Sequence, residues 1–169
     1  MAVRSIRLYG DPILASVSDP VHTVDEGIRG LITDLCDTTR EPGRAGVAAC
    51  QIGVGLRAFS INIGGEISYL INPEIVEFGG ELRDVEEGCL SVPDLFFPTP
   101  RYSYARARGI DLDGHEVELE GEGLLAQALQ HETDHLNGIV YVRRLHPEVR
   151  RQAMSAIRKS DWFHAATER

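Results

Sequence analysis

The stretch Gln130-His131-Glu132-Thr133-Asp134-His135-Leu136 is the most informative part of this chain. It lies in a segment from about Glu122 to Asn137 that has helical apolar spacing and is stopped by Gly138. Because four helical residues advance about 400°, His131 and His135 share one face, one turn apart. The apolar residues of the segment predict a mostly buried helix; they are Leu124, Leu125, Ala128, Leu129 and Leu136.

Two imidazoles placed in this way can hold one divalent metal ion. Glu132 is turned by about 100° from His131, so it can touch a water on the metal without joining the ligand set. This is the H-E-x-x-H arrangement of metal hydrolases, and the competing interpretation is a charged helix that happens to contain two histidines. Two histidines on a buried helix need partners, and a metal ion supplies them. We therefore expect a metal site.

A catalytic metal site needs a third protein ligand and an open position for water. Downstream, the spacing continues like that of a metzincin protease, but Tyr141 stands where the next ligand is expected. Upstream, Cys89 lies in a segment bounded by Gly88 and Pro93, which is loop-like or edge-like. Its thiolate can complete a Cys-His-His site, and the alternative is a half-buried small apolar residue.

The rest of the pattern mixes helices with antiparallel strands. Helical spacing is found from Asp25 to Thr39, with Thr23 or Asp25 as the cap, and from about Pro147 to Lys159. Strands are predicted at Leu56–Ile63, Ile67–Ile71, Glu74–Phe78, Tyr102–Leu112 and Glu116–Glu120. Such a mixture is typical of an α+β fold. Since no linker divides the chain, one domain is expected over residues 1–169.

The composition argues against binding to DNA or membranes. A net charge of −9 disfavours broad non-specific contact with nucleic acid or anionic lipid, and simple solubility explains it. No apolar run approaches a membrane span, and the N-terminal residues lack the apolar core of a signal peptide. Three cysteines are too few for a disulfide framework. A cytoplasmic location is expected.

Three separated segments resemble the signature motifs of peptide deformylases, in the same order and at similar separations. They are Gly46-Val47-Ala48-Ala49-Cys50-Gln51, Glu87-Gly88-Cys89-Leu90-Ser91 and the stretch from Gln130 to Leu136. The start, Tyr9-Gly10-Asp11-Pro12-Ile13-Leu14, is also similar to the N-terminal segment of this family. The resemblance implies a single α+β domain with β-sheets around a central metal-bearing H-E-x-x-H helix and a C-terminal helix packed outside.

The resemblance also implies a reaction and a metal. The expected enzyme is a metal-dependent hydrolase that removes the N-terminal formyl group from formyl-methionyl nascent polypeptides and releases formate. Cys89, His131 and His135 would be the metal ligands, and Glu132 would be the general acid and base. The resemblance implies one divalent metal ion, Fe²⁺ in bacterial cells, with Zn²⁺, Ni²⁺ or Co²⁺ able to occupy the same site.

Further roles follow from the same likeness. Gln51 and the backbone N–H of Leu90 would stabilise the oxyanion, while Gly46 and Gly88 would offer backbone groups to an extended peptide. An apolar pocket for the methionine side chain is also expected. By position relative to the motifs, four residues would line it, and they could equally be ordinary core residues: Ala45, Val85, Leu124 and Ala128.

Three residues depart from the usual motifs. Arg44 replaces a Gly at the start of the first motif, Cys50 replaces a Pro or Thr before the Gln, and Phe96 stands where many relatives carry a substrate-contacting Arg. Neither Arg44 nor Cys50 removes a catalytic group, so we expect these two to affect specificity. Phe96 would pack on the peptide instead of binding its carbonyl. Arg44 would contact the substrate or be an ordinary exposed arginine, and Cys50 would be core or approach Cys89.

Two further hypotheses concern partners and alternatives. Basic residues near the C-terminus form either a solvated helix face or a docking surface for the ribosome; they are Arg143, Arg144, Arg150, Arg151, Arg158 and Lys159. A catalytically silent binding module on the same fold is a competing interpretation. Retention of Glu132 and Gln51 argues against it, because a binder needs neither.

Overall fold

Five antiparallel strands form one sheet in the order β1-β2-β3-β4-β5 in the computed structural model, which describes residues 2–167. The strands are β1 (Gly46–Ala48), β2 (Ala58–Ile63), β3 (Glu66–Cys89), β4 (Val92–Ile110) and β5 (Glu116–Glu122). The helices are α1 (Glu26–Thr39), α2 (Gly123–Leu136), α3 (Pro147–Arg158) and α4 (Asp161–Thr167), with short 3₁₀ turns at Pro12–Ala15, Ala49–Ile52 and Tyr141–Arg143. The α+β prediction is confirmed.

The sequence predicted the three longer helices to within about one residue at each end. Asp25 is the cap of α1, because its side chain accepts a hydrogen bond from the backbone N–H of Ile28 at 3.0 Å. The short helix α4 was not predicted. Among the described helices, none has both the length and the apolarity required to cross a bilayer.

Two predicted strands, Ile67–Ile71 and Glu74–Phe78, are parts of the single strand β3. The Asn72-Pro73 pair between them had indicated a turn. Instead, Asn72 adopts a φ of 51°, and its side chain forms hydrogen bonds of 2.8 Å with both backbone groups of Val21. The pairing with β4 shifts register here and then resumes, so the turn signal produces a bulge.

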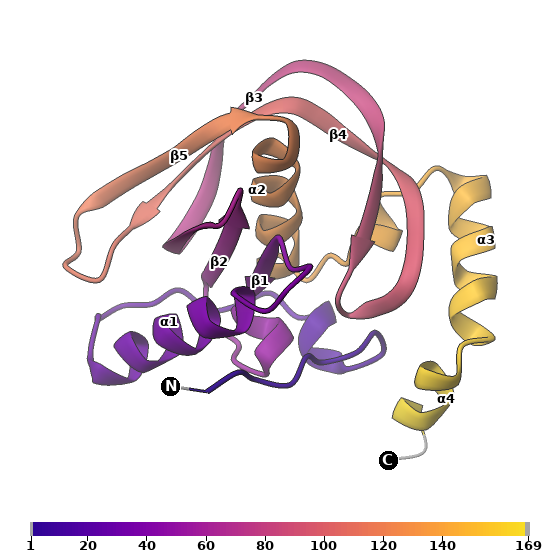
Figure 1. The fold of residues 1–169 in the computed structure, drawn as a ribbon, viewed down its shortest axis with the longest axis horizontal. Helices are drawn as coiled ribbons and strands as arrows, with labels where there is room; N and C mark the ends of the chain where they lie inside the picture. Colours follow the sequence, from indigo (N-terminus) through magenta and orange to yellow (C-terminus); the bar gives the residue numbers. More distant parts are fainter. Residues whose placement is uncertain (1, 168–169) are drawn as a thin grey trace.

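Side chains of the inner strands point alternately to the two faces of the sheet, and this divides the interior into two apolar clusters. Phe59 and Leu70 face the cluster that contains α2, whereas Ala58 and Ile71 face the cluster that contains α1. Successive side chains of a strand point to opposite faces of the sheet, which explains the division. Helices α1 and α2 therefore cover opposite faces of the β1–β2 region (Figure 1).

The long hairpin of β3 and β4 arches over α2, and α3 stands outside its bend (Figure 1). Further register shifts, between Ile75 and Glu77 and between Gly79 and Leu82, break the regular ladder along β3. Each bulge adds local twist and bending. The bent hairpin thereby brings its tip, at Cys89, back to α2.

Helix α2 is enclosed along its C-terminal half, where every residue from Ala128 to Leu136 is buried. It ends at Leu136, two residues before Gly138, the residue predicted to stop it. The N–H of Gly138 donates to the carbonyl of His135 at 3.1 Å, and the N–H of Ile139 donates to that of Asp134 at 2.9 Å. This is a Schellman ending, for which Gly138 has a φ of 71°.

Gly138→Ala is expected to lower the free energy of unfolding by about 3 kcal/mol. The left-handed backbone strains any side chain, and a Cβ would also lie 2.8 Å from the carbonyl oxygen of Ala15. Gly64→Ala is the control, since Gly64 has a φ of 64° with no atom within 4 Å of a Cβ. It should cost only about 1 kcal/mol. Equal losses in urea unfolding would contradict a role for the contact with Ala15.

Candidate active site

Three potential metal ligands converge between the hairpin tip and α2. The donor atoms of Cys89, His131 and His135 all lie within 4.8 Å of one another, and Cys89 Sγ is 3.2 Å from His135 Nε2. The helix supplies the two imidazoles one turn apart, and the end of β3 supplies the thiol. Cys89 is followed by a two-residue turn, Leu90-Ser91, and Val92 begins β4. The segment predicted as loop-like is therefore the tip of a hairpin.

The charge around these donors fits a divalent cation. Burial, and then the neighbouring His131, holds the pKa of His135 well below its usual value, which leaves the neutral imidazole that a metal requires. Burial also lowers the pKa of His131, but Cys89 and then Glu87 outweigh it and raise the pKa well above its usual value. The sulfur and the carboxylate thus stabilise positive charge at this position. A thiol with two imidazoles matches the ligand types of Zn²⁺, Fe²⁺ and related ions.

Glu87 orients the first histidine. Its Oε1 lies 2.6 Å from His131 Nδ1, so Nε2 of that ring is directed towards the other donors. Burial would raise the pKa of Glu87, but hydrogen bonds from Arg101 and His131 outweigh it and lower the pKa to about 2. The carboxylate is therefore ionised and fixes the tautomer of His131.

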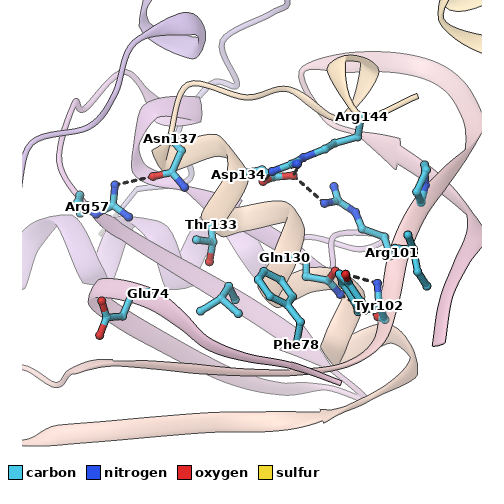
Figure 2. A pocket seen from close by; sticks show the side chains of 13 residues that line it. Arg57, Glu74, Phe78, Arg101, Tyr102, Gln130, Thr133, Asp134, Asn137 and Arg144 are labelled. Atoms are coloured by element: carbon cyan, nitrogen blue, oxygen red, sulfur yellow. Dashed lines mark hydrogen bonds and ion pairs between the residues drawn. The ribbon is translucent and has the colours of Figure 1, made fainter. Parts of the chain in front are cut away.

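Arg101 links this carboxylate to the helix. Its Nε and Nη2 donate to the two oxygens of Glu87 at 2.9 and 2.6 Å, and its Nη1 donates to Asp134 at 2.7 Å. Asp134 is also held by Arg144, whose Nη2 donates at 2.6 Å, so the carboxylate lies between two guanidinium groups (Figure 2). The buried ion pairs of Arg101 thus connect β3, β4 and α2, and the partly exposed pair of Arg144 adds the segment before α3.

Gln51 enters the site from the first motif. Its Oε1 accepts the N–H of Ala48 at 2.9 Å, so the amide nitrogen is directed towards Cys89 Sγ at 3.6 Å and Ser91 Oγ at 3.2 Å. Cys50 is fully buried and its Sγ donates to the carbonyl of His135 at 3.5 Å. Burial, then Glu132 and Cys89, raises the pKa of Cys50 to about 12, in agreement with the prediction that it belongs to the core.

Glu132 lies beside the ligands with one oxygen unsatisfied. Burial raises the pKa of Glu132 to about 7, and its Oε2 has no hydrogen-bond partner among the described residues. Gly46 of β1 packs directly against it: a Cβ there would lie 2.8 Å from Cδ of Glu132. Such an atom needs a partner from outside the protein, namely water or substrate.

A cleft of about 480 Å³ opens onto this group. The predicted binding residues Gly46, Gly88, Ala45, Leu124 and Ala128 line it, together with Leu90. Val85 does not; it lies in β3 opposite Thr99, beyond the residues that border the cleft. Sequence distance from the motif could not show where along the strand the cleft ends.

Two of the unusual residues also border the cleft. Arg44 donates from Nη1 to the carbonyl of Thr38 at 2.9 Å. The ring of Phe96, which is 63% exposed, lies over Gly88, where a Cβ would be 2.6 Å from Cδ1 of the ring. Tyr141, at the position where a metzincin would have a ligand, is buried and donates to the carbonyl of Leu95 at 2.9 Å.

The family model described as polypeptide deformylase matches residues 3–151. The chain belongs to the peptide deformylase family. Among curated relatives, a peptide deformylase of a Parafrankia species is 48% identical over 163 residues, which cover 96% of this chain and 89% of the relative. The resemblance deduced from the three motifs is confirmed.

Solved structures of this family share the fold. A crystal structure of a peptide deformylase from Legionella pneumophila is 41% identical, with a TM-score of 0.87 and 99% of both chains covered. Peptide deformylase from Ehrlichia chaffeensis in complex with actinonin is 35% identical, with a TM-score of 0.87 and coverage of 95% of this chain and 99% of that one.

Sequence reasoning assigned no role in this site to Glu87, Arg101, Asp134, Arg144 or Ser91. The sequence did contain a signal for the role of Glu87. A histidine that binds a metal through one nitrogen needs an acceptor for the other, and an acidic residue stands two positions before Cys89. The partners of Arg101 depend on how β3 and β4 bend, which no local pattern reveals.

Arg101→Met is expected to lower the free energy of unfolding by about 3–5 kcal/mol, because it leaves the buried carboxylates of Glu87 and Asp134 without their shared cation. Arg144→Met should cost about 1 kcal/mol or less, since the side chain of Arg144 is 47% exposed and water replaces it. Urea unfolding measures both variants. Similar losses would contradict the distinction between the buried and the exposed contact with Asp134.

Proposed function

We propose that Cys89, His131 and His135 hold one divalent metal ion, within a catalytic domain formed by residues 1–169. The donor convergence within 4.8 Å, beside the unpaired oxygen of Glu132, is the observation that carries this proposal. The enzyme is a metal-dependent hydrolase that removes the N-terminal formyl group from nascent polypeptides. Fe²⁺ is the proposed ion in the cell, with Zn²⁺, Ni²⁺ or Co²⁺ as substitutes, because a thiolate softens the site.

The metal, when bound, would supply a water of lowered pKa and a Lewis acid for the formyl oxygen. Glu132 takes a proton from the attacking water and returns it to the leaving amine. Its burial and raised pKa, about 7, suit a group that must both accept and donate near neutral pH.

Gln51 is proposed to stabilise the charge that develops on the formyl oxygen. Its carbonyl is held by Ala48, which directs the amide nitrogen towards the site before substrate arrives. The backbone N–H of Leu90, at the hairpin turn, is the proposed second donor. Losing one such donor typically costs about 3–4 kcal/mol of transition-state stabilisation.

The peptide is proposed to extend along the cleft. Gly46 belongs to β1, an outer strand of the sheet, and Gly88 also borders the cleft. Extended peptides commonly add to such an edge through backbone hydrogen bonds. Ala45, Leu124 and Ala128 would contact the methionine side chain, while Arg44 and the exposed ring of Phe96 would contact later residues of the peptide.

The full chain, loaded anaerobically with Fe²⁺ or Ni²⁺, is expected to release formate from formyl-Met-Ala-Ser. Glu132→Gln should reduce the rate by about 10²–10⁴-fold while the metal content stays the same, because the variant keeps the ligands and loses the proton acceptor. Acetyl-Met-Ala-Ser serves as the control for formyl specificity. Absence of formate from folded, metal-loaded protein would overturn the proposed function.

We further propose, on the basis of charge, that the C-terminal basic residues contact the ribosome in the cytoplasm. Arg144 is occupied by Asp134 and Arg151 by Glu148, so the remaining cations around α3 would carry the contact: Arg143, Arg150, Arg158 and Lys159. Binding to ribosomes, measured by cosedimentation, should weaken strongly between about 50 and 200 mM salt. Salt-insensitive or absent binding would refute this contact.

A further inference from the structure

A second cavity, of about 760 Å³, lies against a different face of α2. None of its lining residues borders the catalytic cleft. Helix α2 contributes Gln130, Thr133 and Asp134 to it, and Asn137 follows the end of the helix. We call it the rear cavity (Figure 2). Its volume falls within the range of roughly 300–1,000 Å³ that is usual for small-molecule sites.

Exposed apolar side chains gather at the two cavities. Among the large apolar residues that are exposed within residues 2–167, Phe96 and Leu124 line the catalytic cleft. Three others line the rear cavity: Phe78, Leu82 and Tyr102. The rings of Phe78 and Tyr102 lie 5.1 Å apart at a tilt of 36°. Grouped apolar exposure of this kind marks a binding surface.

The charged groups at one end of the rear cavity are not paired with each other. Arg57 donates only to uncharged acceptors, namely the carbonyls of Leu136 and Pro73 and the side chain of Asn137, at 3.0–3.2 Å. Glu74 borders the same end and its negative charge acts on Arg57, although the two form no ion pair among the described residues. At the other end, by contrast, Asp134 is paired with both Arg101 and Arg144.

The cavity is therefore amphipathic in a definite direction. In Figure 2, Arg57 and Glu74 lie at one end, and Phe78 and Tyr102 lie towards the other. A ligand with only a carboxylate would be repelled by the negative charge of Glu74, and a ligand with only an amine would be repelled by the positive charge of Arg57. A molecule that carries both groups on neighbouring atoms would satisfy both residues and place its side chain on the aromatic surface.

We propose that the rear cavity binds an apolar α-amino acid, with its carboxylate at Arg57, its ammonium at Glu74 and its side chain against Phe78 and Tyr102. This site is separate from the catalytic cleft and does not depend on the deformylation reaction. The other charged residues of the cavity, Arg101, Asp134 and Arg144, are satisfied by one another.

The test is a titration of the ¹⁵N-labelled full chain, loaded with Zn²⁺, followed by NMR. L-phenylalanine is the probe, with N-acetyl-L-phenylalanine lacking the ammonium group and phenethylamine lacking the carboxylate. We expect saturable shifts of the amides of Phe78, Leu82 and Tyr102 with a Kd on the order of 1 mM. Each analogue should bind about fivefold more weakly.

Two variants make the test specific to the cavity. Glu74→Gln should weaken the binding of L-phenylalanine about fivefold and leave the binding of N-acetyl-L-phenylalanine unchanged, because only L-phenylalanine has an ammonium group that can pair with Glu74. Phe78→Ala should weaken all three probes. Leu124→Ala, which removes an exposed apolar side chain from the catalytic cleft, is the control and should leave the rear-cavity shifts intact.

Three outcomes would overturn the proposal. They are shifts confined to Gly88–Leu90 in the catalytic cleft, shifts that do not saturate, and an equal response of L-phenylalanine and its N-acetyl form to Glu74→Gln. Thermal unfolding of each variant shows whether it is folded. The readout is binding alone, so a failure here leaves the proposed deformylation untouched.

Discussion

Arg101 lies between Glu87 and Asp134, and this buried ion triplet determines the geometry of the site. It joins two strands to the helix that carries both histidines. Removing one partner of such a group is far more costly than replacing the whole group by apolar residues. We therefore interpret the triplet as a device that positions side chains and not as a source of net stability. The triplet fixes Glu87, Glu87 fixes the ring of His131, and the ring directs one nitrogen towards the metal position.

The enclosure of α2 makes this arrangement necessary. A helix with buried residues Gln130, His131, Glu132, Thr133, Asp134 and His135 must find partners for nearly all their polar atoms. Gln130 binds the backbone of Tyr102, and Asp134 binds two arginines. Among the described residues, Thr133 Oγ1, His135 Nδ1 and one oxygen of Glu132 have no hydrogen-bond partner. A metal ion would satisfy the histidine nitrogens near Cys89, and a water would satisfy the Glu132 oxygen.

The sequence predicted the features that depend on local periodicity and missed those that depend on how strands bend. Helical spacing alone placed His131 and His135 on one face, and Gly138 marked the end of α2 correctly. The motifs identified Cys89 as the third ligand candidate, and the structure brings it to the histidines. By contrast, the contact of Glu87 with Arg101 joins residues 14 positions apart on neighbouring strands, and it depends on bulges whose positions the sequence did not predict.

The misplaced elements have physical reasons too. Asn72-Pro73 is a turn signal, yet Asn72 is held by the backbone of Val21, 51 residues away, so the strand continues. Helix α4 has only seven residues, too few for a clear apolar period. Val85 was assigned to the methionine pocket by its position relative to the motifs, but it is not among the residues of β3 that border the cleft.

Anaerobic titration of the full chain with Co²⁺, followed by ultraviolet and visible absorption, tests the metal centre most directly. The convergence of Cys89, His131 and His135 predicts one Co²⁺ per chain with a thiolate-to-metal charge-transfer band. That band should disappear in Cys89→Ser and persist in Cys50→Ser and Cys36→Ser, which remove the other thiols. A band that survives in Cys89→Ser, or that disappears only when Cys50 is replaced, would contradict the ligand set on which the account rests.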